Sequence, residues 1–412
     1  MIPFSTYRLK NGLRLLHYFD KNTQMVALNL LYDVGSKDED PKTTGLAHLF
    51  EHLMFTGSKH APTFDAPLQA AGGSSNAWTS VDMTNYYETL PAQNVETAFW
   101  LEADRLRYLN LTDESIDTQK SVVIEEFKQR CLNVPYGDFY HICNDLAYKV
   151  HPYRWPTIGL RVEDVKNASH EEIKSFFARH YAVDNLILCV SGHISFENAV
   201  KFAEKWFGDF SPANISARNL PQEPAQTQQR LLRVNRKVPQ NMITMMYHMC
   251  GRGGADYQAC DMLSDVLSNG TSSRFYRNVL VKTGLFTELD ASVSGTIDPG
   301  LFIVRARLAD GVTFGKAQKA IDSELADFLR TGATAYEMEK CANKFESNQL
   351  FDTISYEKKG VKLCNYELLG DAAGINSEVE KYRNITQEKL MSVAVDLLKS
   401  DNCSILYYGP DA

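Results

Sequence analysis

Apolar residues along this chain fall into two recurring patterns, one with helical spacing and one of short continuous runs. The runs at residues 26–34 and 242–249 are almost wholly apolar, which predicts two buried strands. Residues 169–192 and 386–409 each begin with a Ser or Thr helix cap and continue with helical spacing. Both then pass through an Asp-Asn pair into an apolar run closed by glycine, which predicts a strand.

The segments 169–192 and 386–409 align without a gap at a constant offset of 217 residues, which indicates an internal repeat. The chain is therefore predicted to contain two copies of one domain. We place them at 1–220 and 231–412, joined by a polar, proline-containing linker at 221–230. Each copy is predicted to carry helices on one face of a mainly antiparallel sheet, so the expected fold class is α+β with two homologous α/β domains.

Composition narrows the class of protein. With 412 residues, of which 44% are hydrophobic, the chain can bury the cores of two domains. A net charge of -8 gives no basic face for nucleic acid, and no apolar run reaches the roughly 18 residues of a membrane span. The eight cysteines form no C-x-x-C pair and are expected to be free thiols. We expect a cytoplasmic protein, although a chain from which a leader had been removed would have the same features.

The residues with the clearest chemistry are His48, Glu51 and His52, which spell H-x-x-E-H in a segment patterned as a helix. Residues four apart share one helix face, so both imidazoles can reach a single metal ion. Glu51 shares that face, where its carboxylate can accept a proton from water and pass it to a leaving amine. The same residues would also suit a helix buried in a core, with the imidazoles only hydrogen-bonded. A catalytic zinc needs a third protein ligand from elsewhere.

This motif resembles that of the inverzincins, the pitrilysin-like zinc metallopeptidases. The resemblance implies a glutamate as the third zinc ligand on a second helix, and within residues 119–127 that position falls on Glu126. Helical spacing puts Glu126 on the same stripe as Gln119, whereas Glu125 points elsewhere. The family usually has a glutamate at the position of Gln119, beside the ligands. Glutamine can orient a ligand but adds no negative charge.

Residues 72–91 are similar to the family segment that forms an edge strand beside the zinc ion. An exposed edge offers unpaired backbone groups, with which an extended peptide can pair. The resemblance therefore implies that Asn76 and Ala77 bind substrate. Without the zinc motif, the same run would suit an ordinary hairpin strand.

A homologous partner subunit is implied by the second half of the chain. Residues 270–286 resemble a family segment whose Arg and Tyr hold the substrate and the developing oxyanion. The corresponding positions here are Leu280 and Thr287, so both polar groups are missing. The family encloses its chamber with four such domains, and this chain has two. We therefore expect a heterodimer, in preference to a homodimer, whose other subunit supplies the Arg/Tyr pair.

The resemblance implies a zinc-dependent endopeptidase that hydrolyses short or unfolded peptides in a chamber closed by a partner subunit. His48, His52 and Glu126 would bind Zn²⁺, and Glu51 would be the catalytic residue. Two alternatives stay open. One is a non-catalytic assembly subunit of a larger complex, and the other is a peptidase dedicated to one precursor.

Overall fold

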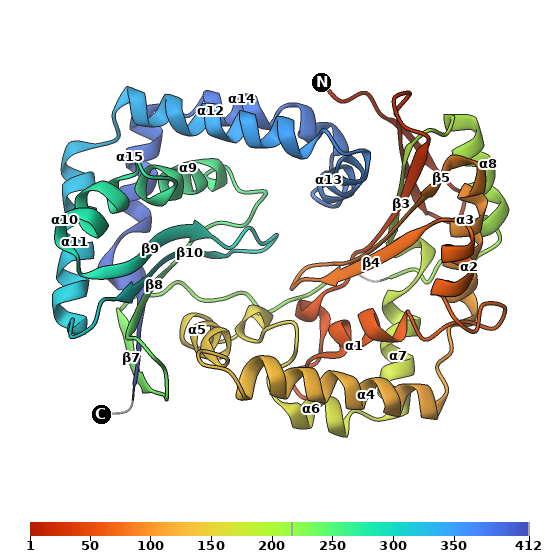
Figure 1. Cartoon of the computed structure of the whole chain (residues 1–412), viewed down its shortest axis with the longest axis horizontal. Helices are drawn as coiled ribbons and strands as arrows, with labels where there is room; N and C mark the ends of the chain where they lie inside the picture. Colours follow the sequence, from red (N-terminus) through yellow and green to blue (C-terminus); the bar gives the residue numbers. More distant parts are fainter. Residues whose placement is uncertain (216, 411–412) are drawn as a thin grey trace. The chain divides into compact units, whose positions relative to one another are not determined.

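The computed structural model describes residues 1–215 and 217–410, which form two compact units (Figure 1). Unit 1 consists of Met1–Arg130, Trp155–Pro221 and Leu350–Asn376. Unit 2 consists of Cys131–Arg154, Gln222–Gln349 and Ser377–Ala412, of which the last two residues lie outside the description.

Unit 1 is built on a six-stranded sheet in the order β1-β2-β6-β3-β5-β4. Its strands are Ser5–Arg8 (β1), Arg14–Phe19 (β2), Met25–Tyr32 (β3), Ser74–Thr79 (β4), Thr84–Pro91 (β5) and Leu186–Gly192 (β6). Only β2 and β6 pair in parallel, and all other neighbours are antiparallel. The central strand β3 is a continuous apolar run because both faces of the sheet are buried: Leu28 and Leu30 belong to one core and Leu31 to another.

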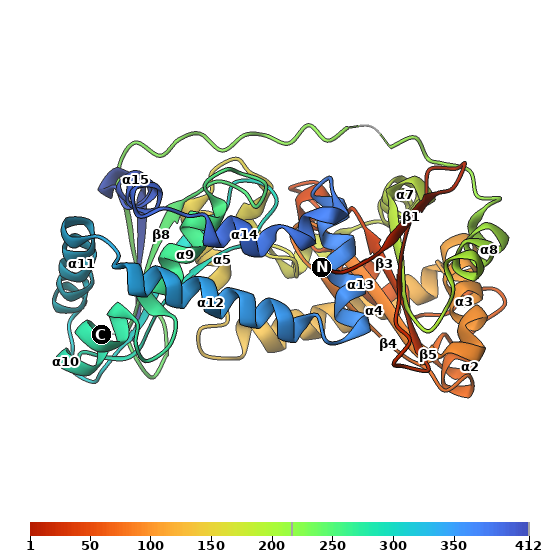
Figure 2. The ribbon, with the colours of Figure 1, turned by 90° about the horizontal axis from the view of Figure 1, so that it is seen from above.

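Most helices of the first half pack against the face of this sheet that carries Leu28 and Leu30. The helices of the first half are Leu46–Leu53 (α1), Asp65–Ala70 (α2), Val95–Tyr108 (α3), Asp113–Phe127 (α4), Phe139–Ala147 (α5), Val162–Asn167 (α6), His170–His180 (α7) and Phe196–Phe207 (α8). Helices α3 and α8 lie side by side in both views (Figures 1 and 2).

Unit 2 contains a five-stranded sheet in the order β7-β11-β8-β10-β9. Its strands are Arg230–Asn235 (β7), Met242–His248 (β8), Phe286–Val293 (β9), Leu301–Leu308 (β10) and Cys403–Gly409 (β11). Only β7 and β11 pair in parallel. The helices of the second half are Tyr257–Ser268 (α9), Val281–Thr283 (α10), Phe314–Thr331 (α11), Ala335–Asp352 (α12), Tyr356–Leu368 (α13), Glu378–Arg383 (α14) and Gln387–Leu397 (α15).

Two helices pack on the sheet of the opposite half of the sequence. Helix α13 packs on β3 and β6 in unit 1 (Figure 1), where Leu363 and Cys364 are fully buried. Gly360 allows this close approach, since a Cβ there would lie 3.0 Å from the Ser191 hydroxyl on β6. Helix α5 packs on β8 and β11 in unit 2. The two helices begin at Phe139 and Tyr356, which are separated by the same 217 residues as the internal repeat.

The predicted α+β class with two mainly antiparallel sheets is confirmed. The unbroken domains predicted at 1–220 and 231–412 differ from the two units, because Cys131–Arg154 belongs to unit 2 and Leu350–Asn376 to unit 1. The reason is the exchange of α5 and α13, each of which buries apolar side chains on the other sheet. The main division falls after Pro221, inside the predicted linker.

All eight cysteines are free thiols, and six of them are buried. Among residues 1–215 and 217–410, no helix is both long and apolar enough to cross a membrane.

Candidate metal centre

Helix α1 carries two of the candidate ligands, and the buried side chain of Glu39 caps its start. The backbone at Gly45, just before the helix, has a φ of 92°, a left-handed conformation that favours glycine. No side chain of the flanking residues caps the helix. Instead the two carboxyl oxygens of Glu39 accept hydrogen bonds from the backbone N–H groups of Gly45 and Ala47, each at 2.8 Å. Leu49, Phe50 and Leu53 are fully buried and fix the helix in the core of unit 1.

Helix α4 presents the third candidate ligand. Thr112 caps its start by accepting a hydrogen bond from the Ser115 backbone N–H at 3.2 Å. The buried side chain of Val123 belongs to the same core as the apolar residues of α1. Glu126 lies against the α1 imidazoles, whereas Glu125 is exposed and pairs with Lys128 at 2.6 Å. The structure therefore distinguishes the two neighbouring glutamates in the way helical spacing predicts.

His48, His52 and Glu126 form a compact cluster whose donor atoms all lie within 4.8 Å of one another. One carboxylate oxygen of Glu126, Oε2, lies 3.2 Å from His52 Nε2 and 3.7 Å from His48 Nε2. Donors of a tetrahedral zinc ion, each about 2.0–2.1 Å from the metal, lie about 3.3 Å apart. Two imidazoles and one carboxylate are a known ligand set of catalytic zinc, which leaves a fourth position open. The residues present therefore fit Zn²⁺.

Burial keeps the first imidazole ready to bind a metal. The His48 side chain is only 11% exposed, against 26% for His52. Burial lowers the pKa of His48 to about 4, so its imidazole is neutral at pH 7 and its lone pair is available. The Nδ1 atom of His48 is buried and has no hydrogen-bond partner among the described residues.

Glu51 is connected to the edge of the sheet through one hydrogen bond. The hydroxyl of Thr79, the last residue of β4, donates to Glu51 Oε2 at 2.5 Å. Strand β4 pairs only with β5 within the described residues, so its other edge is open. Asn76 is exposed and Ala77 half-buried on this strand, as an edge position requires. The sheet therefore brings the predicted substrate strand next to the helix of the H-x-x-E-H motif.

Other residues singled out by sequence have simpler environments. The Gln119 side chain makes no hydrogen bond among the described residues, so it orients no ligand in this structure. Leu280 packs against the core of unit 2, and the Thr287 hydroxyl only approaches the Arg307 carbonyl at 3.5 Å. Arg274, on the same segment, forms an ion pair with Glu337 at 2.7 Å. The described residues contain one cluster of metal-ligating side chains, and none of it comes from unit 2.

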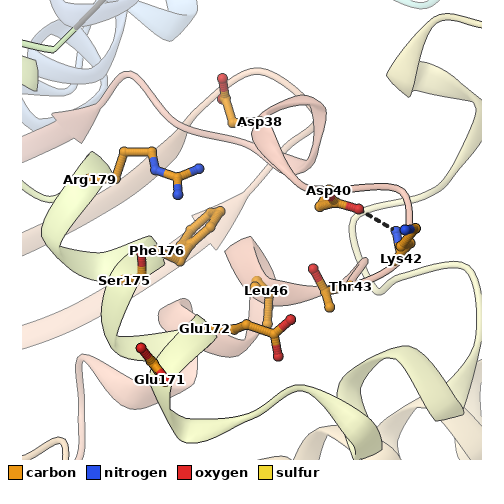
Figure 3. Close-up of a pocket in the computed structure, with 10 residues that line it drawn as sticks. All are labelled: Asp38, Asp40, Lys42, Thr43, Leu46, Glu171, Glu172, Ser175, Phe176 and Arg179. Carbon is orange, nitrogen blue, oxygen red and sulfur yellow. Dashed lines mark hydrogen bonds between the residues drawn. The ribbon is translucent and has the colours of Figure 1, made fainter.

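A surface hollow of about 390 Å³ lies near the start of α1 (Figure 3). Its lining includes Leu46 from α1 and Phe176 and Arg179 from α7. Figure 3 shows charged side chains around these two apolar residues. None of the three candidate ligands lines it, so the hollow is separate from the metal centre.

Three residues that support this centre were not predicted from the sequence. Arg130 forms an ion pair with Glu126, Thr79 donates a hydrogen bond to Glu51, and Glu39 accepts hydrogen bonds from the start of α1. The Arg130 contact was visible in principle, because residues four apart on a helix are neighbours. The other two depend on segments that only the folded chain brings together.

Comparison with known proteins agrees with the geometry. Residues 16–133 match the family described as "Insulinase (Peptidase family M16)", and residues 167–345 match "Peptidase M16 inactive domain". The chain is 26% identical over 410 residues to the zinc protease PqqE of Helicobacter pylori, covering 98% of this chain and 92% of the relative. It is 24% identical to the uncharacterized zinc protease YmxG of Bacillus subtilis, covering 96% of each.

Solved structures share the fold. A protease from Helicobacter pylori superposes with a TM-score of 0.92 at 26% identity, over 100% of both chains. Pitrilysin superposes with a TM-score of 0.80 at 17% identity, over 100% of this chain and 45% of its own. The two family matches, the zinc protease relatives and the shared two-domain fold together show that the chain belongs to the pitrilysin-like M16 family of zinc peptidases.

Proposed function

We propose that this chain is a zinc-dependent endopeptidase that hydrolyses short or unfolded peptides. The observation that carries the proposal is the meeting of three features in unit 1. These are the cluster of two imidazoles and a carboxylate, the Glu51 carboxylate next to His52 on the same helix, and the open edge of β4 bonded to Glu51 through Thr79.

His48, His52 and Glu126 would hold the zinc ion, which when bound polarises the scissile carbonyl and activates water. Glu51 accepts the proton of the attacking water and then delivers it to the leaving amine. Thr79 donates to one oxygen of Glu51 and so limits how far that carboxylate can rotate. The resulting reaction is general-base and then general-acid catalysis of peptide hydrolysis.

Peptide binding is assigned to β4. An extended substrate would add to the open edge as a further strand, with Asn76 and Ala77 among the residues that it meets. Recognition through backbone groups depends little on sequence, which suits a peptidase for short or unfolded chains. A folded protein offers few free backbone groups for such pairing.

A second, homologous subunit is proposed to complete the enzyme. Leu280 carries no polar group, and the Thr287 hydroxyl faces the Arg307 carbonyl at 3.5 Å, so the second half of this chain lacks the Arg and Tyr that would hold an oxyanion. Pitrilysin supports this view, since it carries the same fold over 45% of a single longer chain. We propose a heterodimer with a homologous chain that supplies the missing Arg and Tyr. The cytoplasmic location stays a prediction.

The test is cleavage of quenched fluorescent peptides by the zinc-loaded protein, alone and co-expressed with its nearest homologous chain. Glu51→Gln removes the general base while keeping the side chain's shape, and should lower kcat by at least about a thousandfold with zinc still bound. Glu125→Gln is the matched control, because Glu125 lies on α4 one residue from Glu126 but is exposed. It should leave turnover within twofold.

Each result has a clear meaning. Turnover only in the co-expressed pair supports both the peptidase and the heterodimer. Turnover by the chain alone supports the peptidase and refutes the need for a partner. No turnover on any peptide, despite bound zinc, contradicts the proposal and favours an assembly subunit or a peptidase dedicated to one precursor.

A further inference from the structure

The two carboxylate oxygens of Glu126 have different partners. Oε2 faces both imidazoles, at 3.2 Å from His52 Nε2 and 3.7 Å from His48 Nε2. Oε1 instead forms an ion pair with the Arg130 guanidinium, at 2.9 Å from Nη2. The arrangement leaves one oxygen for the metal and commits the other to a positive charge.

Arg130 lies one turn after Glu126, in a stretch where the helix changes its winding. Helix α4 ends at Phe127 and continues as a π-helical turn over Lys128–Leu132, a rare irregularity that is frequent at functional sites. Arg130 follows Glu126 by four residues and folds back over it. Its side chain is 70% exposed, and Glu126 is the only acidic side chain that it pairs with in the described part of the chain.

The sign of the charge beside Glu126 decides the effect of this ion pair on a metal. A partner that accepts a proton from a ligand makes that ligand more basic and strengthens metal binding. Arg130 does the opposite, because its positive charge lies against Glu126 Oε1 and draws negative charge away from the metal. Its positive charge also lies close to the centre and repels the zinc cation.

We propose that Arg130 tunes the metal through Glu126, lowering zinc affinity and increasing the pull of the centre on the substrate carbonyl. The second part rests on the proposed peptidase function, whereas the first does not. Neutralising the carboxylate leaves more of the zinc charge available to stabilise an oxyanion. The extra charge on the zinc matters in a chain whose second half has Leu280 and Thr287 in place of the Arg and Tyr.

The test compares Arg130→Met with Lys128→Met. Both remove one positive charge from the same turn, but Lys128 pairs with the non-ligand Glu125 at 2.6 Å. The zinc dissociation constant is measured by competition with a chromogenic chelator, and kcat by peptide cleavage in the active assembly. Arg130→Met should bind zinc about 3- to 10-fold more tightly and lose about tenfold in kcat. Lys128→Met should change either quantity by less than twofold.

Two further measurements separate charge from geometry. Arg130→Lys keeps the charge and should keep most of the wild-type affinity and turnover. The tighter binding of Arg130→Met should shrink at high ionic strength, because the guanidinium is largely exposed and therefore screened.

Weaker zinc binding in Arg130→Met would overturn the proposal, since it would make Arg130 a brace for the ligand. Unchanged zinc affinity would also overturn it and leave an ordinary surface ion pair. If the wild type cleaves no peptide, the peptidase function fails, but the zinc measurement still decides whether Arg130 acts on the metal.

Discussion

Replacing Thr79 with valine is expected to impair catalysis without disturbing the metal centre. Valine keeps the β-branched shape that suits β4 but removes the hydroxyl that donates to Glu51 at 2.5 Å. A hydrogen bond to a charged group contributes about 1.5–3 kcal/mol, and each 1.4 kcal/mol corresponds to a factor of ten. Thr79 is only half-buried, so water can partly replace it, and we expect kcat to fall about 10- to 100-fold.

The assay is steady-state cleavage of a quenched peptide by Thr79→Val, with zinc content measured on the same sample. KM should stay within about threefold, because the proposed pairing with the substrate uses the backbone of β4 and not the Thr79 hydroxyl. Zinc content should be unchanged, since Thr79 bonds to Glu51 and to no candidate ligand. Thr79→Ser keeps the hydroxyl and serves as the matched control.

Two results would refute this reasoning. Thr79→Val with wild-type kcat would mean that Glu51 needs no support from β4. Thr79→Ser as damaged as Thr79→Val would mean that the methyl group, and hence packing at the end of β4, is what matters.

Three other predictions concern stability. At a free zinc concentration 100 times the dissociation constant, bound zinc should add about 2.7 kcal/mol to the free energy of unfolding, and a chelator should remove this contribution. His52→Ala should abolish the response to the chelator. An equal response in the variant would place the metal elsewhere. Burial raises the pKa of Glu39 from 4.5 to about 8, so the native state keeps a proton that the unfolded chain has lost between these values. The contribution of Glu39 to the free energy of unfolding is therefore fully present below pH 4.5 and is lost as the pH rises to 8, by at most about 1.4 kcal/mol per pH unit. Glu39→Gln should flatten the pH dependence of unfolding by denaturant. In the same assay, Leu363→Ala should lower the free energy of unfolding by about 3 kcal/mol, because Leu363 is fully buried between α13 and the sheet of unit 1. Lys358 is exposed, so Lys358→Ala should lower it by less than about 0.5 kcal/mol. Equal losses in the two variants would contradict the observed packing of α13.

Local patterns were enough to predict the elements that carry the metal centre. The predicted helices at 45–55 and 119–127 correspond to α1, Leu46–Leu53, and to the second half of α4. The strand predicted at 26–34 is β3, Met25–Tyr32. These succeeded because apolar spacing along a few turns or one strand already reports which side is buried.

The exchange of α5 and α13 could not be predicted in the same way. Both helices have ordinary amphipathic patterns, and nothing in either segment tells which sheet it will cover. Their placement depends on the shape of two apolar sheet faces that form far away in sequence. The unbroken domains drawn from the 217-residue repeat therefore described the duplication but not the units that pack together.

The sequence alone determined the chemistry available to this protein: two imidazoles and a carboxylate four or fewer residues apart on one helix, a second glutamate on another, and their absence from the second copy. Helical periodicity suffices for such assignments because it acts over neighbouring residues. Only the tertiary structure decided which groups control these side chains. Thr79 meets Glu51 because sheet pairing puts the end of β4 beside α1, and Glu39 meets Gly45 because the loop between them turns back toward the start of the helix. Contacts of this kind depend on the positions of separate elements in space, which no local spacing rule contains.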